Sequence, residues 1–111
     1  MALSDIALRY LDIFCSGKDF DELKELFAED LRFEGPFFQC DSAEVYIERL
    51  KSDPPERPEY RVIKVFEDDD SVNVIYEFSK GSISSRMSQL FWFAKGKITW
   101  ILLIFDSADF A

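Results

Sequence analysis

Two apolar segments near the end of the chain, residues 84–93 and 98–105, constrain the fold more than any other feature. Strands that lie at a protein surface usually alternate between apolar and polar residues. The second segment instead contains two apolar sets, which are Ile101, Leu103 and Phe105 on one face and Trp100, Leu102 and Ile104 on the other. The first segment shows the same pattern, with Met87, Phe91 and Phe93 opposite Leu90 and Trp92. A sheet built from such strands must be covered on both faces.

The remainder of the chain is expected to form helices that cover one of these faces. Apolar residues at helical spacing predict three helices, at residues 4–15, 19–27 and 41–51. Ser4 is expected to cap the first helix and Gly17 to end it in a left-handed conformation. Alternating and β-branched residues predict a short strand and then a four-stranded antiparallel meander, at residues 31–34, 60–67, 72–79, 84–93 and 98–105. This order predicts an α+β fold in one domain spanning residues 1–111.

The second face of the sheet needs a partner, because three helices can cover only one face. An exposed apolar patch of that size marks an association site. We therefore predict a homodimer that forms through the outer face of the sheet, with Trp92 and Trp100 near the centre of the contact. The residues expected in this interface are Leu90, Trp92, Trp100, Leu102 and Ile104.

An excess of acidic residues and the lack of histidine exclude several classes of function. The chain has 22 Asp and Glu against 13 Lys and Arg, which gives a formal net charge of −9. Such a charge repels phosphate backbones and anionic membrane surfaces, so neither nucleic acid nor a membrane is expected as a partner. Because the sequence contains no His, histidine-based catalytic triads and histidine-ligated metal sites are excluded. We predict no metal and no cofactor.

The N-terminal residues and the cysteines favour a cytoplasmic location. No basic segment followed by a long apolar stretch opens the sequence, so no signal peptide is expected. The longest apolar run, residues 100–105, is far shorter than the roughly 20 residues that span a membrane. Cys15 and Cys40 are too few for a disulfide framework and are expected to be free thiols in a reducing compartment.

Several short segments resemble ketosteroid isomerase and its SnoaL-like relatives, members of the nuclear transport factor 2-like superfamily. The segments that carry the resemblance are Arg9–Tyr10, Cys15–Asp19, Leu26–Asp30, Phe33–Pro36, Gly96–Ile98 and Leu102–Asp106. The resemblance implies a cystatin-like cone, in which three N-terminal helices pack on a strongly curved antiparallel sheet. It also implies an apolar pocket open at one end and dimers that pair through the convex sheet face.

The cone implied by the resemblance assigns one apolar set of each strand to the pocket. The residues expected to line it are Tyr10, Phe14, Phe33, Met87, Gln89, Phe91, Ile101, Leu103 and Phe105. Gln89 stands out among them, because a buried amide without a hydrogen-bond partner costs about 1–3 kcal/mol. Its presence favours a polar region in the cavity.

The catalytic positions of the isomerases are only partly matched. Tyr10 corresponds to the tyrosine that donates a hydrogen bond to the oxyanion. Gln89 corresponds to a second donor, which is a protonated aspartate in the isomerases, and Gly35 stands where they carry the aspartate that acts as the base. A glycine has nothing to accept a proton. We therefore predict no catalytic residue and no intact isomerase machinery.

Three hypotheses about function remain open. The first is a protein that binds a small, mostly apolar molecule in the pocket. The second is an enzyme of unassigned reaction, an isomerase, hydrolase or cyclase, in which Tyr10 and Gln89 polarise an oxygen and Glu34 or Glu77 acts as acid or base. Strand alternation turns Glu34 away from Phe33, although a bulge at Gly35 would turn it inward. The third is a non-catalytic dimeric interaction domain.

Overall fold

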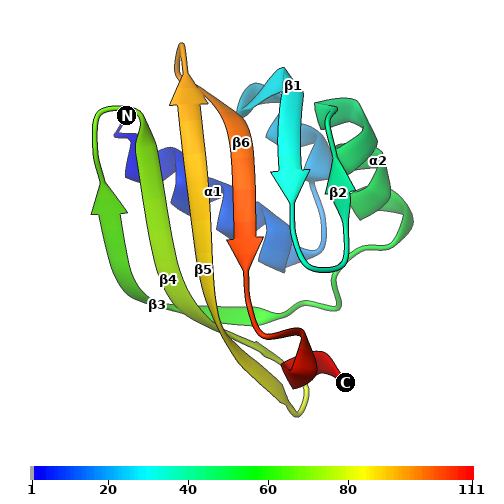
Figure 1. The fold of residues 1–111 in the computed structure, drawn as a ribbon. Helices are drawn as coiled ribbons and strands as arrows, with labels where there is room; N and C mark the ends of the chain where they lie inside the picture. Colours follow the sequence, from blue (N-terminus) through cyan, green and yellow to red (C-terminus); the bar gives the residue numbers. More distant parts are fainter. Residues whose placement is uncertain (1) are drawn as a thin grey trace.

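The computed structural model describes residues 2–111, which form a strongly curved open sheet with helices on one side (Figure 1). Over this range the sheet has six strands in the order β2-β1-β6-β5-β4-β3. The strands are β1 (Phe27–Glu34), β2 (Gln39–Cys40), β3 (Glu59–Glu67), β4 (Ser71–Lys80), β5 (Ile83–Ala94) and β6 (Lys97–Ile104). β3 to β6 begin and end within one residue of the predicted bounds. The predicted α+β class is confirmed.

The sheet differs from the prediction in the additional short strand β2 and in the direction of one strand pair. β1 and β6 run parallel, with Phe27 opposite Ile98 and Glu34 opposite Leu102, whereas the other neighbouring strands are antiparallel. Parallel strands require a long crossover connection. Between β1 and β6 this connection consists of α2 and the β3–β5 meander, so the parallel pair follows from the path of the whole chain.

The helical elements differ from the prediction at their ends, and the C-terminal helix was not predicted. They are α1 (Leu3–Ser16), the 3₁₀-helix η1 (Phe20–Glu25), α2 (Ala43–Ser52) and the C-terminal 3₁₀-helix η2 (Ser107–Phe110). α1 begins before the predicted cap Ser4, because the Asp5 carboxylate already accepts from the Ala2 N–H at 3.2 Å. The Ser4 N–H instead donates to the Glu67 carboxylate at 2.7 Å. Gly17 ends α1 with φ 72°, as predicted.

The predicted second helix is shorter than expected and is a 3₁₀-helix. Its expected last residue, Phe27, belongs to β1, which starts four residues earlier than the predicted strand 31–34. Pairing with β6 explains the change, since the Ile98 N–H donates to the Leu26 carbonyl at 2.8 Å and holds the segment extended. α2 is capped by Ser42, whose Oγ accepts from the Val45 N–H at 3.3 Å.

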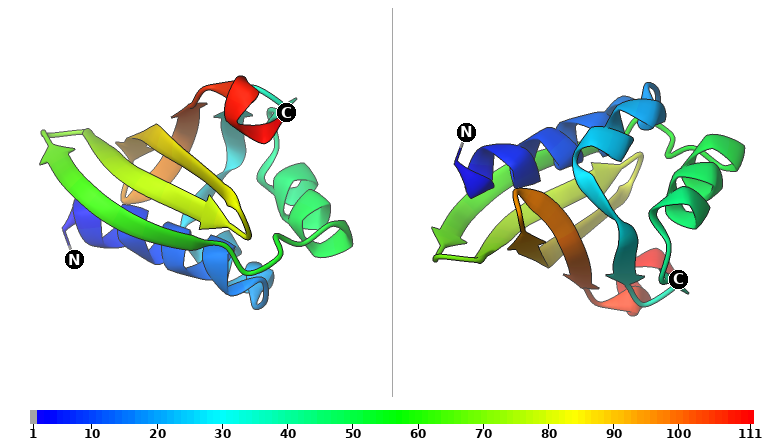
Figure 2. Two further views of the ribbon diagram at one scale, coloured as in Figure 1. Left: turned by 90° about the horizontal axis from the view of Figure 1, so that it is seen from below. Right: turned by 90° about the horizontal axis from the view of Figure 1, so that it is seen from above.

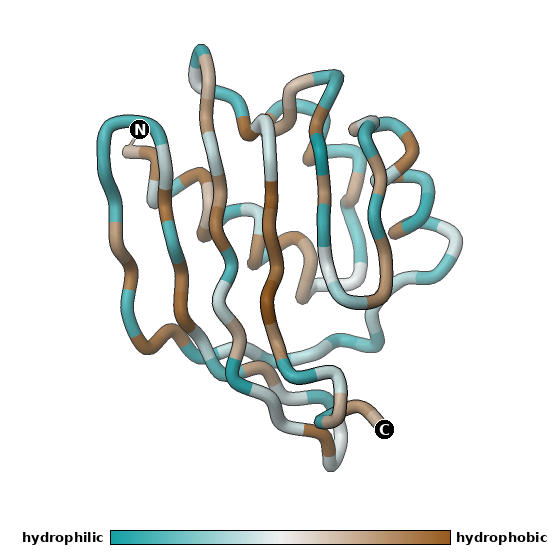
Figure 3. Tube along the Cα trace, in the orientation of Figure 1, coloured by the Kyte–Doolittle hydropathy of each residue, from teal (hydrophilic) through white to brown (hydrophobic). Residues whose placement is uncertain are grey.

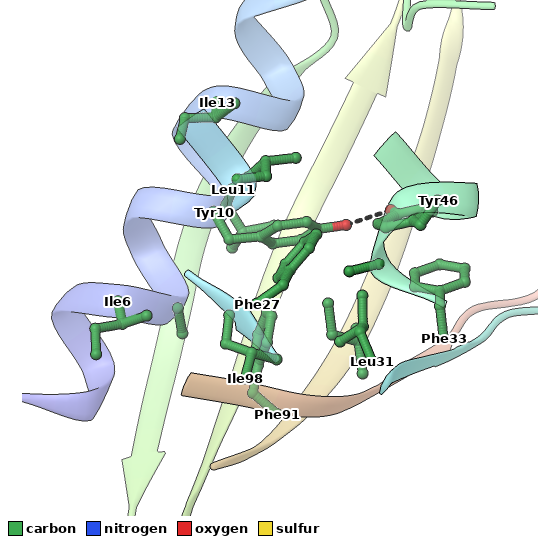
Figure 4. Close-up of a cluster of buried hydrophobic side chains, with 14 of the residues drawn as sticks. Ile6, Tyr10, Leu11, Ile13, Phe27, Leu31, Phe33, Tyr46, Phe91 and Ile98 are labelled. Atoms are coloured by element: carbon green, nitrogen blue, oxygen red, sulfur yellow. Dashed lines mark hydrogen bonds between the residues drawn. The ribbon is translucent and has the colours of Figure 1, made fainter. Parts of the chain in front are cut away.

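One face of the sheet packs on α1 and the other has no helix over it within residues 2–111. Both views in Figure 2 place α1 on one side of the curved strands. Along β5, buried and less buried residues alternate strictly from Ser85 to Phe93. β6, in contrast, is hydrophobic along most of its length (Figure 3), as its two apolar sets predict. The core on the inner face includes Tyr10, Leu31, Phe91 and Ile98 (Figure 4).

Candidate functional site

A cavity of about 370 Å³ opens between α1, α2 and the inner face of β4, β5 and β6. Its size falls within the range of about 300–1,000 Å³ that is usual for small-molecule sites. The turn after β1, the segment 53–58 and η2 complete its wall. Most of the wall is apolar and aromatic, and its phenylalanines are Phe14, Phe33, Phe37, Phe38, Phe78, Phe105 and Phe110.

Four buried polar side chains interrupt this apolar wall, and together we call them the hydroxyl–amide cluster. They are Tyr10, Tyr46, Tyr76 and Gln89, each no more than 3 % exposed. The hydroxyls of Tyr10 and Tyr46 lie 2.5 Å apart in a hydrogen bond (Figure 4). The Tyr76 hydroxyl donates to Oε1 of Gln89 at 2.7 Å. The predicted polar region at Gln89 is therefore built by tyrosines from two helices and a strand.

The local structure explains how the four side chains meet. Tyr10 lies on the buried face of α1 and Tyr46 on the buried face of α2. Tyr76 and Gln89 are diagonal neighbours on β4 and β5, because Val74 is paired with Gln89. Diagonal side chains on one face of an antiparallel pair are within reach of each other when they are long. The Gln89 amide thus provides the hydrogen-bond acceptor that the buried Tyr76 hydroxyl needs on the inner face of the sheet.

The hydroxyl–amide cluster is electrically neutral. Burial is the largest cause that raises the pKa of Tyr10, Tyr46 and Tyr76 above the ordinary value for tyrosine. The Gln89 side chain opposes this effect at Tyr10 and lowers its pKa. Burial, with the nearby Asp12 carboxylate, also raises the pKa of the cavity-lining Cys15 thiol to about 12. At neutral pH these groups therefore offer neutral hydrogen bonds and no anion.

The carboxylates that the sequence offered as acid or base lie away from the cavity. Glu34 is on the other face of β1 from Phe33 and pairs with Arg32 at 2.6 Å. Glu77 pairs with Arg61 and Arg86 at 3.1 and 2.9 Å, also outside the cavity wall. Alternation along the strands therefore determines both orientations, and the turn at 35–36 does not rotate Glu34 inward.

The cavity wall has carboxylates only near its entrance among the residues described. They are Asp53 and Glu56, both from the segment that follows α2. None of the hydrogen bonds found within residues 2–111 joins a carboxylate to the hydroxyl–amide cluster. Gly35 does line the cavity, where it contributes no side chain. Within the same residues, no group of three or more Cys, Asp and Glu is placed to hold a metal ion.

The cavity brings together most of the residues that the sequence assigned to it. Tyr10, Phe14, Phe33, Met87, Gln89, Leu103 and Phe105 line its wall. Phe91 and Ile101 do not, because both are fully buried in the core beneath it. The Phe91 ring packs edge-on against the Tyr10 ring at 5.6 Å and so supports the cluster from behind.

Sequence reasoning missed several residues of the cavity wall. Tyr46 falls within the helix predicted at residues 41–51, where a buried tyrosine signals a hydroxyl that needs a partner. Tyr76 falls within the strand predicted at residues 72–79. Arg49 and Phe110 gave no local signal, since α2 and η2 reach the cavity only through the path of the chain.

The outer face of the sheet carries the residues predicted for the dimer contact. Leu90, Trp92, Trp100 and Leu102 are half-buried there, and Ile104 is 56 % exposed. The two tryptophan rings stack with centroids 4.5 Å apart. Within residues 2–111 no helix is both long and apolar enough to cross a membrane.

The family profile of the SnoaL-like domain matches residues 7–101, which is most of the chain. The chain belongs to the SnoaL-like family. The fold described above is shared with solved NTF2-like structures. Among curated proteins none matches this SnoaL-like chain.

Solved structures with the same fold carry different names. An NTF2-like protein of unknown function from Cytophaga hutchinsonii has a TM-score of 0.83 and 24% identity, covering 99% of this chain and 95% of its own. A putative ketosteroid isomerase from Kribbella flavida has a TM-score of 0.80 and 20% identity, with coverage of 94% and 77%. A putative SnoaL-like polyketide cyclase from Jannaschia has a TM-score of 0.79 and 18% identity, with coverage of 96% and 86%. At such identities the likeness shows the fold alone.

Proposed function

We propose that this SnoaL-like protein binds a small, mostly apolar molecule in its cavity, and that it does not carry out the ketosteroid isomerase reaction. The observation that carries the proposal is the hydroxyl–amide cluster on an otherwise aromatic wall. Ligand sites are typically apolar pockets in which a few polar groups fix the orientation of the ligand. The ligand presents one uncharged oxygen, a carbonyl or a hydroxyl, to this cluster.

The neutral state of the cluster selects the kind of oxygen that binds. Tyr10, Tyr46 and Tyr76 remain protonated, and no cation contacts their hydroxyls in the hydrogen bonds of the residues described. A carboxylate oxygen would lose its hydration there without gaining a counter-charge, which is costly in a buried site. A ketone or phenol loses much less.

The missing base argues against the isomerase reaction. Abstraction of a proton beside a carbonyl requires a base within hydrogen-bond reach of the carbon that loses it. Gly35 provides none, and Glu34 and Glu77 are held in ion pairs outside the cavity. An enzymatic function that needs a carboxylate as acid or base would use Asp53 or Glu56, since these carboxylates line the wall.

Binding of a matched pair of ligands tests the proposal. Acetylnaphthalene and ethylnaphthalene have similar shapes, but only the first has a carbonyl oxygen. We expect acetylnaphthalene to raise the melting temperature of the protein more, because ligands that bind the folded state stabilise it. The Tyr10→Phe variant should reduce this difference. Equal or absent shifts with both compounds would contradict the proposal, and turnover of a β,γ-unsaturated ketone to its conjugated isomer would contradict its second part.

We also propose that a second copy of the chain covers the convex outer face of the sheet. Trp92, Trp100 and Ile104 support this, because a contiguous apolar patch favours association. Arg32, which lies beside Trp100, is already paired with Glu34 within the chain. A two-fold contact would therefore bring no unpaired like charges together from these groups.

We further propose a cytoplasmic location for the protein. Cys15 and Cys40 are both free thiols, which is usual in a reducing compartment. Fractionation of cells that produce the tagged chain tests this, and recovery of the protein in a secreted or membrane fraction would contradict it.

A further inference from the structure

Arg49 is an arginine of the cavity wall that has no ion pair. In residues 2–111, Arg9, Arg32, Arg61 and Arg86 each lie within 4 Å of a carboxylate. Arg49 does not, although the chain carries 22 acidic residues. In a chain with such an excess of carboxylates, an unpaired guanidinium on a cavity wall is available to a ligand.

The Arg49 guanidinium lies over an aromatic ring and is not held by hydrogen bonds within the described residues. Its central carbon lies 4.7 Å from the centre of the Phe38 ring, and Phe38 itself lines the cavity. A guanidinium is planar and can stack on the face of an aromatic ring. The N–H donors of a guanidinium point outward from its edge, where they match the two oxygens of a carboxylate. None of the side-chain hydrogen bonds found in the described part of the chain uses these donors.

Arg49 lies at the cavity entrance together with other charged residues. We define the entrance by the exposed residues of the wall, which are Pro36, Phe37, Arg49, Asp53, Pro54 and Glu56. Glu56 pairs with Lys80, another residue of the wall, at 3.8 Å. Asp53 is the remaining carboxylate of the entrance, and it weakens the attraction of an anion without forming an ion pair with Arg49.

The two ends of the cavity therefore differ in the groups they accept. The hydroxyl–amide cluster is buried and neutral, whereas the entrance is exposed and carries the unpaired guanidinium. A ligand that fills the cavity keeps its charged group at the entrance, because a charge is costly to bury without a partner.

We propose that the ligand of this cavity is an amphipathic carboxylate, with an aromatic or aliphatic body, an uncharged oxygen at the hydroxyl–amide cluster, and its carboxylate on Arg49. This rests on the proposed function, because it assigns the charge of the same ligand. Arg49 is then the residue that distinguishes a free acid from its ester or amide.

A series of three naphthols tests the proposal. Each has its hydroxyl on one ring, and the distal position of the other ring carries a carboxylate, a methyl ester or an aminomethyl group. We expect the carboxylate to bind the protein roughly tenfold more tightly than the ester in isothermal titration calorimetry, as a charge-assisted pair of N–H···O bonds gives about that factor. The Arg49→Gln variant should abolish the difference, because it weakens binding of the carboxylate far more than binding of the ester.

Two further variants serve as controls. Arg57 also lacks an ion pair in the described residues but is not part of the cavity wall, so Arg57→Gln should keep the preference for the carboxylate. Asp53→Asn removes the opposing charge and should increase that preference.

The outcomes separate this inference from the proposed function. Equal binding of carboxylate and ester, or tighter binding of the amine, would overturn the role of Arg49 and leave the proposed function standing. A preference for the carboxylate that persists in Arg49→Gln would also overturn it. Failure of all three naphthols to bind would contradict the proposed function itself.

Discussion

Gln89 is the residue on which the buried hydroxyl–amide cluster depends, because an amide both accepts and donates hydrogen bonds. Its Oε1 accepts from Tyr76, and its side chain also acts on the Tyr10 hydroxyl. A carboxylate at the same position would be charged or would need a raised pKa. The amide keeps this part of the cavity neutral over the whole physiological pH range.

Replacement of Gln89 should destabilise the protein through the hydroxyl it leaves behind. In Gln89→Leu, the buried Tyr76 hydroxyl loses its acceptor, which costs about 1–3 kcal/mol. The double variant Tyr76→Phe with Gln89→Leu removes both partners, so its loss of stability should be smaller than the sum of the two single losses. Urea unfolding of the four proteins measures this coupling. Additive losses would show that the two groups do not interact.

The buried tyrosines also predict how stability depends on pH. Burial raises the pKa of Tyr10, Tyr46 and Tyr76 in the folded protein, whereas in the unfolded chain it is about 10. Above about pH 10 the unfolded state therefore binds fewer protons, and stability falls as pH rises, by about 1.4 kcal/mol per pH unit for each tyrosine. Cys15 acts in the same direction from about pH 9 to 12.

Urea unfolding measured from about pH 8 to about pH 11, on both sides of the ordinary pKa of tyrosine, tests this dependence. Below the unfolded pKa the stabilisation is complete, so the free energy of unfolding should be flat there with respect to these tyrosines. The Tyr46→Phe variant should show a slope about 1.4 kcal/mol per pH unit shallower than the natural sequence at the upper end. Identical slopes in the two proteins would contradict the assignment.

Among the elements, η2 is the C-terminal helix that contributes to the cavity wall. Phe110 lines the cavity, and its ring centre lies 4.9 Å from that of Phe105 and 6.0 Å from that of Phe37. Asp106 caps η2 by accepting from the Ala108 N–H at 2.9 Å. A helix of four residues has little stability of its own. Side-chain contacts with the sheet must therefore hold it in place.

The contact between β5 and η2 should determine the order of the C-terminal segment. Ser85 donates to the Asp109 carboxylate at 2.7 Å. In Ser85→Ala we expect faster amide hydrogen exchange in residues 107–111 and little change in β4 and β5, because local opening need not unfold the sheet. Hydrogen exchange followed by mass spectrometry measures both. Unchanged exchange in 107–111 would show that the phenylalanine contacts alone hold η2.

The molecule as a whole presents the two surfaces of our proposals, one on each face of a single sheet. The inner face forms the cavity with α1 and α2. The outer face presents Trp92 and Trp100, with the Arg32 guanidinium 4.8 Å from the centre of the Trp100 ring. Since β5 and β6 contribute alternate residues to the two faces, a partner on the outer face would also stiffen the cavity wall.

The proposed dimer predicts the mass of the protein in solution. At micromolar concentration, sedimentation should give the mass of two chains. Ile104→Glu places a charge on the outer face and should give the mass of one chain. Val45→Glu is the matched control, because Val45 is exposed to a similar extent, 52 % against 56 %, but lies on α2. A single-chain mass for the natural sequence would contradict the dimer.

The local pattern of the sequence was sufficient for the meander and for α1. β3 to β6 follow the predicted segments to within one residue, and Gly17 ends α1 as expected. Such boundaries depend on consecutive residues, through alternation, turn residues and caps. The resemblance to the SnoaL-like family then gave the cavity and seven of the residues that line it.

What the sequence left open was every contact that depends on the path of the chain. Tyr10 and Tyr46 are 36 positions apart, yet their hydroxyls share a hydrogen bond. The parallel pairing of β1 with β6 turned Phe27 from a helical residue into a strand residue, and burial in the core removed Phe91 from the cavity wall. Periodicity reports which face of an element is apolar, but it does not report which distant element meets that face. For this protein the sequence thus determined α1, the β3–β6 meander and their buried faces, while the tertiary structure decided which polar groups meet inside the cavity.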